Sequence, residues 1–257
     1  MGAPFTNDFG WCDGTVYVDL WENDKPAYRF KPQAICEQQA PGCVYADELF
    51  ANEAISYIKD HKANRANDPL FLVYTPRAIH TPLWPSQKYV DEFNAFIDNS
   101  IRANYSAMVN EADALVQTIV QELKDQNMWE NTFMYVASDN GGPISINQLK
   151  KNGMSVSGGA NNYPLRGGKF ALTEGGLRVN AFVTGGAIPE AKRGTVEKGF
   201  IANEDWYATF CAIAGCDPVD SRAAQYNLPA IDSINMYPLL MGETSVSPRK
   251  EVRFVNR

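Results

Sequence analysis

Helix-length segments alternate with short apolar runs along this chain, and this alternation restricts the fold more than any other feature. Between residues 101 and 127 the apolar positions fall on one stripe, which predicts a long amphipathic helix. That segment leads into residues 132–136, whose β-branched and aromatic side chains are typical of a buried strand. An earlier pair has the same order, with helical spacing over residues 46–62 and an apolar run over 70–74. The alternation predicts an α/β layered structure with a largely parallel sheet.

The remaining residues divide into a later pair of elements and two irregular stretches. Residues 178–184 are predicted to form a further buried strand, and residues 205–215 a further helix that a glycine ends. Residues 143–168 form the longest loop, which is rich in glycine, and loops of that length inside a domain are usually functional or mobile. Residues 1–45 show no clear period, so we expect an irregular covering segment with short strands at most, followed by one domain over residues 46–257.

Charge and hydropathy exclude several classes of partner. The chain of 257 residues has a formal net charge of -7 and scattered basic residues, which argues against nucleic acid or an anionic membrane surface as the main partner. A hard cation suits such an acidic chain better. No run reaches the roughly eighteen apolar residues of a membrane-spanning helix, so we expect no membrane span. The first residues do not show the pattern of a signal peptide.

Five cysteines leave the redox compartment open. None of them forms the C-x-x-C pair expected of zinc or thioredoxin-like chemistry. Cys36 with Cys43 and Cys211 with Cys216 could close small loops in an oxidising compartment, which would leave Cys12 over. Free thiols in a reducing compartment fit the sequence equally well.

Two polar side chains follow directly on the strand predicted over residues 132–136. Asp139 and Asn140 offer a charged and a neutral oxygen side by side, which suits a hard divalent cation such as Ca²⁺ or Mg²⁺ better than zinc. In open α/β sheets, sites are built at the carboxyl ends of strands. Two ligands are too few for calcium, which takes about six to eight oxygens. On this stretch alone, we favour the alternative of a turn in which these side chains bond the backbone.

Two further candidates lie next to predicted strand ends. His80 follows the apolar run of residues 70–74, where an imidazole could give a proton to a leaving oxygen near neutral pH. Lys169 lies among the glycines of residues 164–169, which let the backbone approach an oxyanion while the ammonium supplies positive charge. Taken singly, a histidine that caps a turn and an ordinary solvated loop are the simpler interpretations. The order of the three elements along the chain favours a common site, whereas His61 is expected to lie on the surface.

Several motifs, in a fixed order along the chain, carry a resemblance to the sulfatase family. They are Pro69-Leu70-Phe71-Leu72-Val73-Tyr74 with Ile79-His80-Thr81-Pro82-Leu83, Tyr105-Ser106-Ala107-Met108-Val109 with Asp113, Ser138-Asp139-Asn140-Gly141-Gly142, Pro164-Leu165-Arg166-Gly167-Gly168-Lys169, and Glu174-Gly175-Gly176-Leu177-Arg178. The chain is most similar to the arylsulfatase B type, and the motifs keep the order and spacing of the family.

The resemblance implies an alkaline-phosphatase-like layered sandwich, with a largely parallel central sheet flanked by helices, and a sulfuric ester hydrolase activity. It implies that Asp139 and Asn140 are Ca²⁺ ligands. It also implies that His80 contacts the sulfate ester near the leaving oxygen and that Lys169 contacts the sulfate. Arg166 and Glu174 belong to the loop that supports Lys169. The partner would then be an aryl or sugar sulfate ester.

Part of the family's site has no counterpart in this sequence. In the family, the nucleophile is a formylglycine made from the cysteine of a C-x-P/A-x-R motif, which lies upstream of the matched part. Cys216 has a proline two residues on, but Asp220 stands where the arginine is required, so we reject it and find no nucleophile in this chain. The family's C-terminal subdomain is also absent. We therefore expect residues 46–257 to be a partial catalytic domain, incomplete at both ends, that an upstream segment or a second chain completes.

Three functions remain open on these grounds. The first is a sulfatase that cleaves sulfate esters when the missing half is supplied. The second is a non-catalytic sulfatase-like protein kept for structure or binding, and the third is a phosphate or phosphonate ester hydrolase with the same fold. The resemblance also implies an exported protein, either lysosomal or secreted, and Asn104-Tyr105-Ser106 is one sequon for N-glycosylation.

Overall fold

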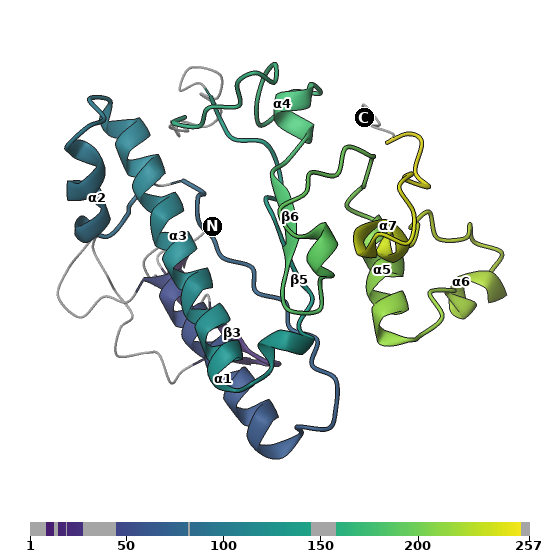
Figure 1. Cartoon of the computed structure of the whole chain (residues 1–257). Helices are drawn as coiled ribbons and strands as arrows, with labels where there is room; N and C mark the ends of the chain where they lie inside the picture. Colours follow the sequence, from purple (N-terminus) through teal and green to yellow (C-terminus); the bar gives the residue numbers. More distant parts are fainter. Residues whose placement is uncertain are drawn as a thin grey trace. The chain divides into compact units, whose positions relative to one another are not determined.

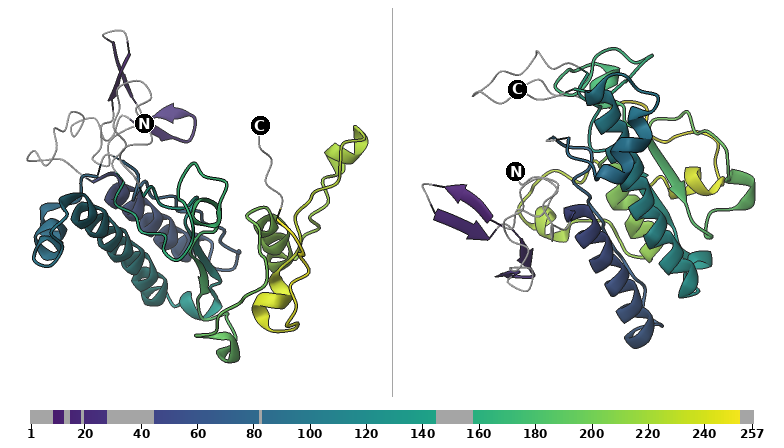
Figure 2. Two further views of the ribbon diagram at one scale, coloured as in Figure 1. Left: turned by 90° about the horizontal axis from the view of Figure 1, so that it is seen from above. Right: turned by 90° about the vertical axis from the view of Figure 1, so that its left-hand side faces the viewer.

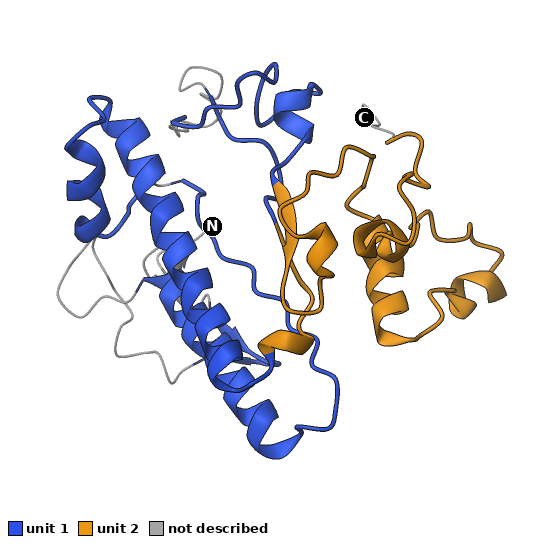
Figure 3. Ribbon diagram, viewed as in Figure 1, with its two compact units in different colours: residues 1–128, 137–180 blue, residues 129–136, 181–257 orange. Residues whose placement is uncertain are grey.

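The computed structural model describes residues 9–12, 15–18, 20–27, 45–81, 83–144 and 158–252. They form two compact units (Figure 3). The first unit comprises residues 1–128 and 137–180, and the second comprises residues 129–136 and 181–257. Each unit is described by itself below.

Only short strands occur among the described residues before residue 45. β1 (Phe9–Cys12) and β2 (Thr15–Val18) form one antiparallel hairpin, and β3 (Trp21–Glu22) and β4 (Lys25–Pro26) form another (Figure 2). Within these positions, the expectation of short strands at most is confirmed. The predicted pairing of Cys36 with Cys43 lies outside the described residues.

Two long helices dominate the first unit. α1 (Ala46–Asn64) and α3 (Ser100–Asp125) lie side by side (Figures 1 and 2), and they confirm the helices predicted over residues 46–62 and 101–127. Asn99 caps α3, because its side-chain oxygen accepts the Arg102 N–H at 3.0 Å. The buried apolar residues of the two helices include many alanines, which allow close packing: Ala46, Ala51, Ala54, Ile58, Ala103, Ala107 and Met108.

The sequence missed two helices of this unit, α2 (Gln87–Asn94) and the short α4 (Glu174–Leu177), and misplaced one side chain. α2 packs on α3, and none of its eight residues is buried. His61, expected on the surface, is only 4% exposed in the last turn of α1. Its position between Asp60 and Lys62 suggested exposure, whereas the ring turns inward.

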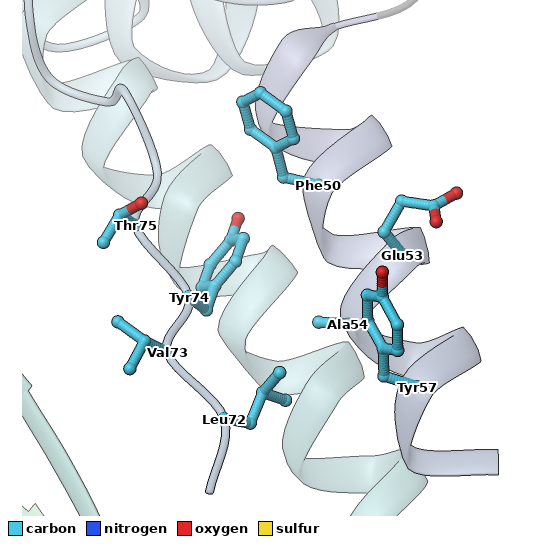
Figure 4. A pocket seen from close by; sticks show the side chains of 8 residues that line it. All are labelled: Phe50, Glu53, Ala54, Tyr57, Leu72, Val73, Tyr74 and Thr75. Carbon is cyan, nitrogen blue, oxygen red and sulfur yellow. The ribbon is translucent and has the colours of Figure 1, made fainter. Parts of the chain in front are cut away.

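The buried strand predicted over residues 70–74 is not found. These residues have no strand partner among the described strands, and Phe71 and Val73 are 70% and 66% exposed. A run of β-forming residues needs a hydrogen-bonded neighbour to become a strand, and no described strand pairs with it. Instead, residues 72–75 line one side of a pocket whose other side is α1 (Figure 4).

β5 (Met134–Ala137) and β6 (Ala181–Thr184) pair with each other and confirm that strands form at the positions predicted over residues 132–136 and 178–184. The predicted burial is wrong, because the residues of both strands are half-buried or exposed, with Phe182 56% exposed. Their direction follows from the flanking hydrogen bonds. The Ser138 N–H donates to the Asn180 carbonyl at 3.2 Å, and the Ala187 N–H donates to the Thr132 carbonyl at 3.2 Å.

Later residues of one segment therefore face earlier residues of the other, which is the antiparallel arrangement. A largely parallel central sheet is not seen among the described residues and stays a prediction. The sequence also suggests a strand over residues 251–255, most of which lies outside the described residues; residues 251–252 are irregular.

The core of the second unit forms around α5 (Asp205–Ala214), which confirms the helix predicted over residues 205–215. Trp206 on this helix stacks on Tyr135, with ring centroids 3.6 Å apart. The cluster of buried residues is completed by Met236, Leu239 and Leu240. The short helices that the sequence did not predict are α4 (Glu174–Leu177), α6 (Ser221–Gln225), α7 (Tyr237–Met241), η2 (Trp129–Asn131) and η3 (Glu190–Lys192).

Candidate functional site

Asp139 and Asn140 lie immediately after β5, as predicted from the sequence. Asp139 is exposed, and the Asn140 side-chain amide donates to the Gly141 carbonyl at 2.9 Å. The Ser138 hydroxyl donates to the Asn140 carbonyl at 2.8 Å, so the strand ends in a turn held by its own side chains. The Asn140 amide bonds the backbone, as the turn interpretation expects, and the exposed Asp139 carboxylate is left accessible to a ligand.

The glycine-rich loop that carries Lys169 is attached to this strand end. The Lys169 N–H donates to the Gly142 carbonyl at 3.2 Å, and the Gly141 N–H donates to the Gly176 carbonyl at 3.0 Å. A Cβ on Gly141 would lie 1.9 Å from the Gly175 carbonyl oxygen, so the two segments touch through their backbones. The structure thus brings Lys169 and the Asp139-Asn140 turn into one group of contacts.

Arg166 and Glu174 lie at the two ends of this supporting loop. The Arg166 carbonyl accepts the Gly175 N–H at 2.8 Å and the Thr173 hydroxyl at 2.6 Å, which closes the loop. Glu174 begins α4 and lies 3.7 Å from the Arg178 guanidinium in an exposed ion pair. Both side chains are exposed, so their structural part here is carried mainly by the backbone.

Asn162 is a residue of this group that the sequence analysis missed. Its amide nitrogen donates to the carbonyls of Gly142 at 2.8 Å and Gly167 at 3.1 Å, and its oxygen accepts the Gly142 N–H at 3.2 Å. One side chain therefore joins the strand end to the Lys169 loop. No periodicity marks such a residue; only its place beside the Tyr163-Pro164 pair indicates a turn.

His80 lies in a turn rather than at a strand end, because the predicted strand before it does not form. Its backbone N–H donates to the Arg77 carbonyl at 2.8 Å. Its ring Nδ1 is 2.7 Å from the Thr81 carbonyl, which can only accept, so Nδ1 carries the proton and Nε2 is available to a ligand. Within the described part of the chain, no hydrogen bond of His80 reaches Asp139 or Lys169.

Two buried carboxylates next to the His80 turn were also missed. Asp47 in α1 accepts the backbone N–H groups of Arg77 and Ala78, at 2.6 and 2.9 Å. Glu111 in α3 accepts the backbone N–H of Ser86 at 3.1 Å. Burial raises the pKa of both carboxyl groups, and these hydrogen bonds oppose that rise. Both residues looked like ordinary charged positions of amphipathic helices in the sequence.

The donor set agrees with a hard cation in kind but not in number. Asp139 and Asn140 provide oxygen donors, which calcium prefers. However, no group of three or more His, Cys, Asp or Glu side chains in the described ranges could hold a metal ion. Two side-chain oxygens leave most of calcium's shell of about six to eight ligands to other donors.

Among the described residues, no helix is long and apolar enough to cross a membrane.

Comparisons with known proteins agree on one family. The family model described as Sulfatase matches residues 5–216. Arylsulfatase J of Mus musculus is 28% identical over 205 residues, which is 79% of this chain and 30% of that protein. N-acetylgalactosamine-6-sulfatase of Sus scrofa is 30% identical over 203 residues, which is 78% of this chain and 34% of that protein. The chain therefore spans about a third of the length of these curated relatives.

Solved structures give the same result. The crystal structure of Ps i-CgsB in complex with k-i-k-neocarrahexaose matches with a TM-score of 0.64 and 30% identity, over 77% of this chain and 39% of that one. The PsFucS1 sulfatase from Pseudoalteromonas sp. matches with a TM-score of 0.61 and 25% identity, over 79% of this chain and 36% of that one. These neighbours support the alkaline-phosphatase-like α/β fold expected from the sequence.

Proposed function

This chain belongs to the sulfatase family, and from that premise we propose that it is the part of a sulfuric ester hydrolase that binds the sulfate group and half of a Ca²⁺ site. The observation that carries the proposal is the attachment of the Lys169 loop to the Asp139-Asn140 turn, through Lys169 to Gly142 and Gly141 to Gly176. This attachment holds the backbone of Lys169 against the backbone that follows Asp139 and Asn140, which supports a shared role in binding an oxyanion and a metal ion. The Lys169 ammonium itself lies over the Phe170 ring, 5.6 Å from the ring centroid.

Each proposed residue has a role that its chemistry supports. The Lys169 ammonium attracts the sulfate oxygens as a compact charge. The His80 imidazole, with its Nδ1–H donated to Thr81, presents Nε2 to the leaving oxygen and holds or gives a proton there. Arg166 and Glu174 support the loop. These assignments are proposals that rest on the family motifs and on the hydrogen bonds above.

Asp139 and Asn140 would hold Ca²⁺ in the complete enzyme. A bound calcium ion supplies positive charge that stabilises the negative charge developing on the sulfate oxygens. The chain's own contribution is to fix the two oxygen donors at the end of β5. The remaining ligands, and the formylglycine nucleophile of the family, would come from residues outside this site, in keeping with a chain that spans about a third of the length of its curated relatives.

Hydrolysis assays on the native protein, with any chain that copurifies, test this function. We expect release of the alcohol from an aryl sulfate and little from the matching aryl phosphate. His80→Ala should lower kcat by about 10²–10⁴-fold, the usual contribution of a positioned acid or base. Lys192→Ala, at a lysine paired with Glu197 in the second unit, is the control and should leave turnover unchanged. Preferred hydrolysis of the phosphate would support the third function considered above, and no turnover of either ester would support a non-catalytic binding protein.

Export is the location that fits this proposal, with a lysosomal or secreted destination as the family resemblance implies. Asn104 of the sequon lies in α3 and is partly exposed. Glycosidase treatment of the native protein should lower its mass if that sequon is used, and an unchanged mass would remove this support.

A further inference from the structure

The segment of residues 77–86, called here the His80 segment, is bonded at both ends to buried carboxylates. Asp47 is fully buried in the first turn of α1, and Glu111 is 6% exposed in α3. Both carboxylates accept hydrogen bonds from this one segment, and the nearby Arg77 charge also favours the ionised form of Asp47. Buried carboxylates are uncommon and need such partners.

Asp47 binds the beginning of the segment with both oxygens. Oδ1 accepts the Arg77 N–H at 2.6 Å and Oδ2 accepts the Ala78 N–H at 2.9 Å. The Tyr74 hydroxyl also donates to the Asp47 carbonyl at 3.1 Å. Buried backbone N–H groups outside a helix or sheet need such partners, because an unpaired donor is costly. The start of α1 therefore fixes the backbone two residues before His80.

Glu111 binds the other end. Oε2 accepts the Ser86 N–H at 3.1 Å, and Oε1 accepts the Ser86 hydroxyl. Leu83 and Pro85, just before Ser86, are buried. Between the two bonded ends, His80 is exposed, and its ring Nδ1 is 2.7 Å from the Thr81 carbonyl. Because the ring is exposed, the bonded ends of the segment contribute to its position.

We propose that Asp47 and Glu111 are positioning residues that together hold His80 in place for the sulfate ester. This role rests on the proposed function of His80. The hydrogen bonds from Asp47 and Glu111 to the His80 segment are present whether or not His80 acts on a sulfate ester. The two carboxylates never touch substrate in this arrangement; they act through the backbone of the His80 segment. Their loss should change how His80 is held before it changes the overall fold.

The two carboxylates differ in a way that allows a matched test. Both Asp47 partners are backbone N–H groups, which can only donate, so Asp47→Asn must turn its amide N–H₂ toward one of them and lose that bond. One Glu111 partner is a hydroxyl, which can also accept, so Glu111→Gln can keep both contacts. Exposed Glu48, next to Asp47 in α1, gives the charge control Glu48→Gln.

Nitrogen NMR of the histidine rings measures the effect directly, because the chain has two histidines and a His80→Ala variant assigns them. We expect wild type to show an Nδ1–H tautomer and an ordered ring for His80. Asp47→Asn should broaden or move the His80 signals while buried His61 and the thermal midpoint change little. Glu111→Gln should cause a smaller change, and Glu48→Gln none.

Unchanged His80 signals in folded Asp47→Asn protein would overturn the proposal. If that variant does not fold, Ser86→Ala removes one hydroxyl from the other end, and unchanged His80 signals there would overturn it as well. In the native enzyme, Asp47→Asn should lower kcat by about 10–100-fold with KM nearly unchanged, as expected for a misplaced catalytic group. A loosened His80 ring in Asp47→Asn, together with no aryl sulfate turnover in wild type, would instead contradict the proposed function while still supporting the positioning role of Asp47.

Discussion

The Lys169 loop can approach the end of β5 closely because Gly141 has no Cβ atom. Gly141 has no room for a side chain, because a Cβ would lie 1.9 Å from the Gly175 carbonyl oxygen. Gly194 also lacks a side chain, but its φ of 70° is the only obstacle there, since nothing lies within 4 Å. Alanine substitutions at these two glycines therefore test two effects separately: steric crowding at Gly141 and the left-handed backbone conformation at Gly194.

Gly141→Ala should push the loop away from β5 and destabilise the protein by about 1–3 kcal/mol or more, the usual range for overpacking. Gly194→Ala should cost about 1–2 kcal/mol from its left-handed backbone alone. Urea denaturation measures both, and calcium or sulfate binding should suffer only in Gly141→Ala. Equal losses of binding in the two variants would contradict the packing described here.

The ionisation of Asp47 should make the free energy of unfolding depend on pH. Burial raises its pKa above the ordinary 3.8, against the Arg77 and Ala78 amides and the Arg77 charge, which lower it. A raised pKa in the folded state means that the stability contributed by the protonated form is present below 3.8 and is lost as the pH rises through the folded pKa. Asp47→Asn cannot ionise, so its destabilisation relative to wild type should be largest in acid and shrink toward neutral pH. A difference that grows with pH in paired urea titrations would contradict the assignment.

At the scale of elements, the long helices and the strands at residues 132–136 and 178–184 were predicted, whereas the strand predicted over residues 70–74 does not form. The apolar stripe over residues 101–127 corresponds to α3, and Gly215 caps the end of α5 as predicted. The run over residues 70–74 has the composition of a strand but no described neighbour. Strand formation depends on a second segment, which composition alone does not reveal.

The same limit applies to the candidate site. Asp139, Asn140 and Lys169 could be found because motifs mark them, and the structure brings their backbones together. Asn162 and Asp47 could not, because each acts on a segment distant in sequence through the backbone, and any polar residue fits the local pattern. Hydrogen bonds to irregular backbone leave no periodic signal.

The end of α5 allows a prediction about the open question of the cysteines. The Cys216 N–H donates to the Cys211 carbonyl at 2.9 Å, and the Gly215 N–H donates to the Ala212 carbonyl at 3.2 Å, which is the Schellman arrangement. In this motif the side chains of the first and last residues meet, and here both are cysteines. We expect oxidised glutathione to convert the two thiols into a disulfide, releasing reduced glutathione.

Mass spectrometry of the peptide that contains both residues, after alkylation without reduction, measures this. Two hydrogens lost and no alkyl group added would agree with the prediction. Cys216→Ser should instead leave Cys211 alkylated. Complete alkylation of both wild-type thiols after oxidation would contradict it.

On the scale of the whole molecule, the second unit depends on one buried ion pair. Asp205 is fully buried and accepts hydrogen bonds from the Arg249 side chain at 2.5 and 2.6 Å and from the Ala202 and Ile234 amides at 2.8 Å. It connects the start of α5 to two distant segments of the unit.

Arg249→Ala leaves this carboxylate buried without its cation and should cost about 3–5 kcal/mol. Fluorescence reports the unfolding, because Trp206 lies in the same core. Arg222→Ala, at an exposed residue of α6, is the control and should stay within about 0.5 kcal/mol of wild type. Similar midpoints for the two variants would contradict the role of Asp205.

We propose that the turn after β5 and the Lys169 loop form half of a sulfatase metal and sulfate site. Calcium titration of the 257-residue chain, followed by backbone amide NMR, tests it most directly. We expect weak binding, with a Kd of about 10⁻³ M or above, because Asp139 and Asn140 supply two of the roughly six to eight oxygens that calcium takes. The shifts should be confined to residues 138–142 and the adjoining loop, lost in Asp139→Ala and kept in Asp68→Ala at an exposed aspartate. Shifts elsewhere, none at all, or unchanged binding in Asp139→Ala would contradict the assignment of this site.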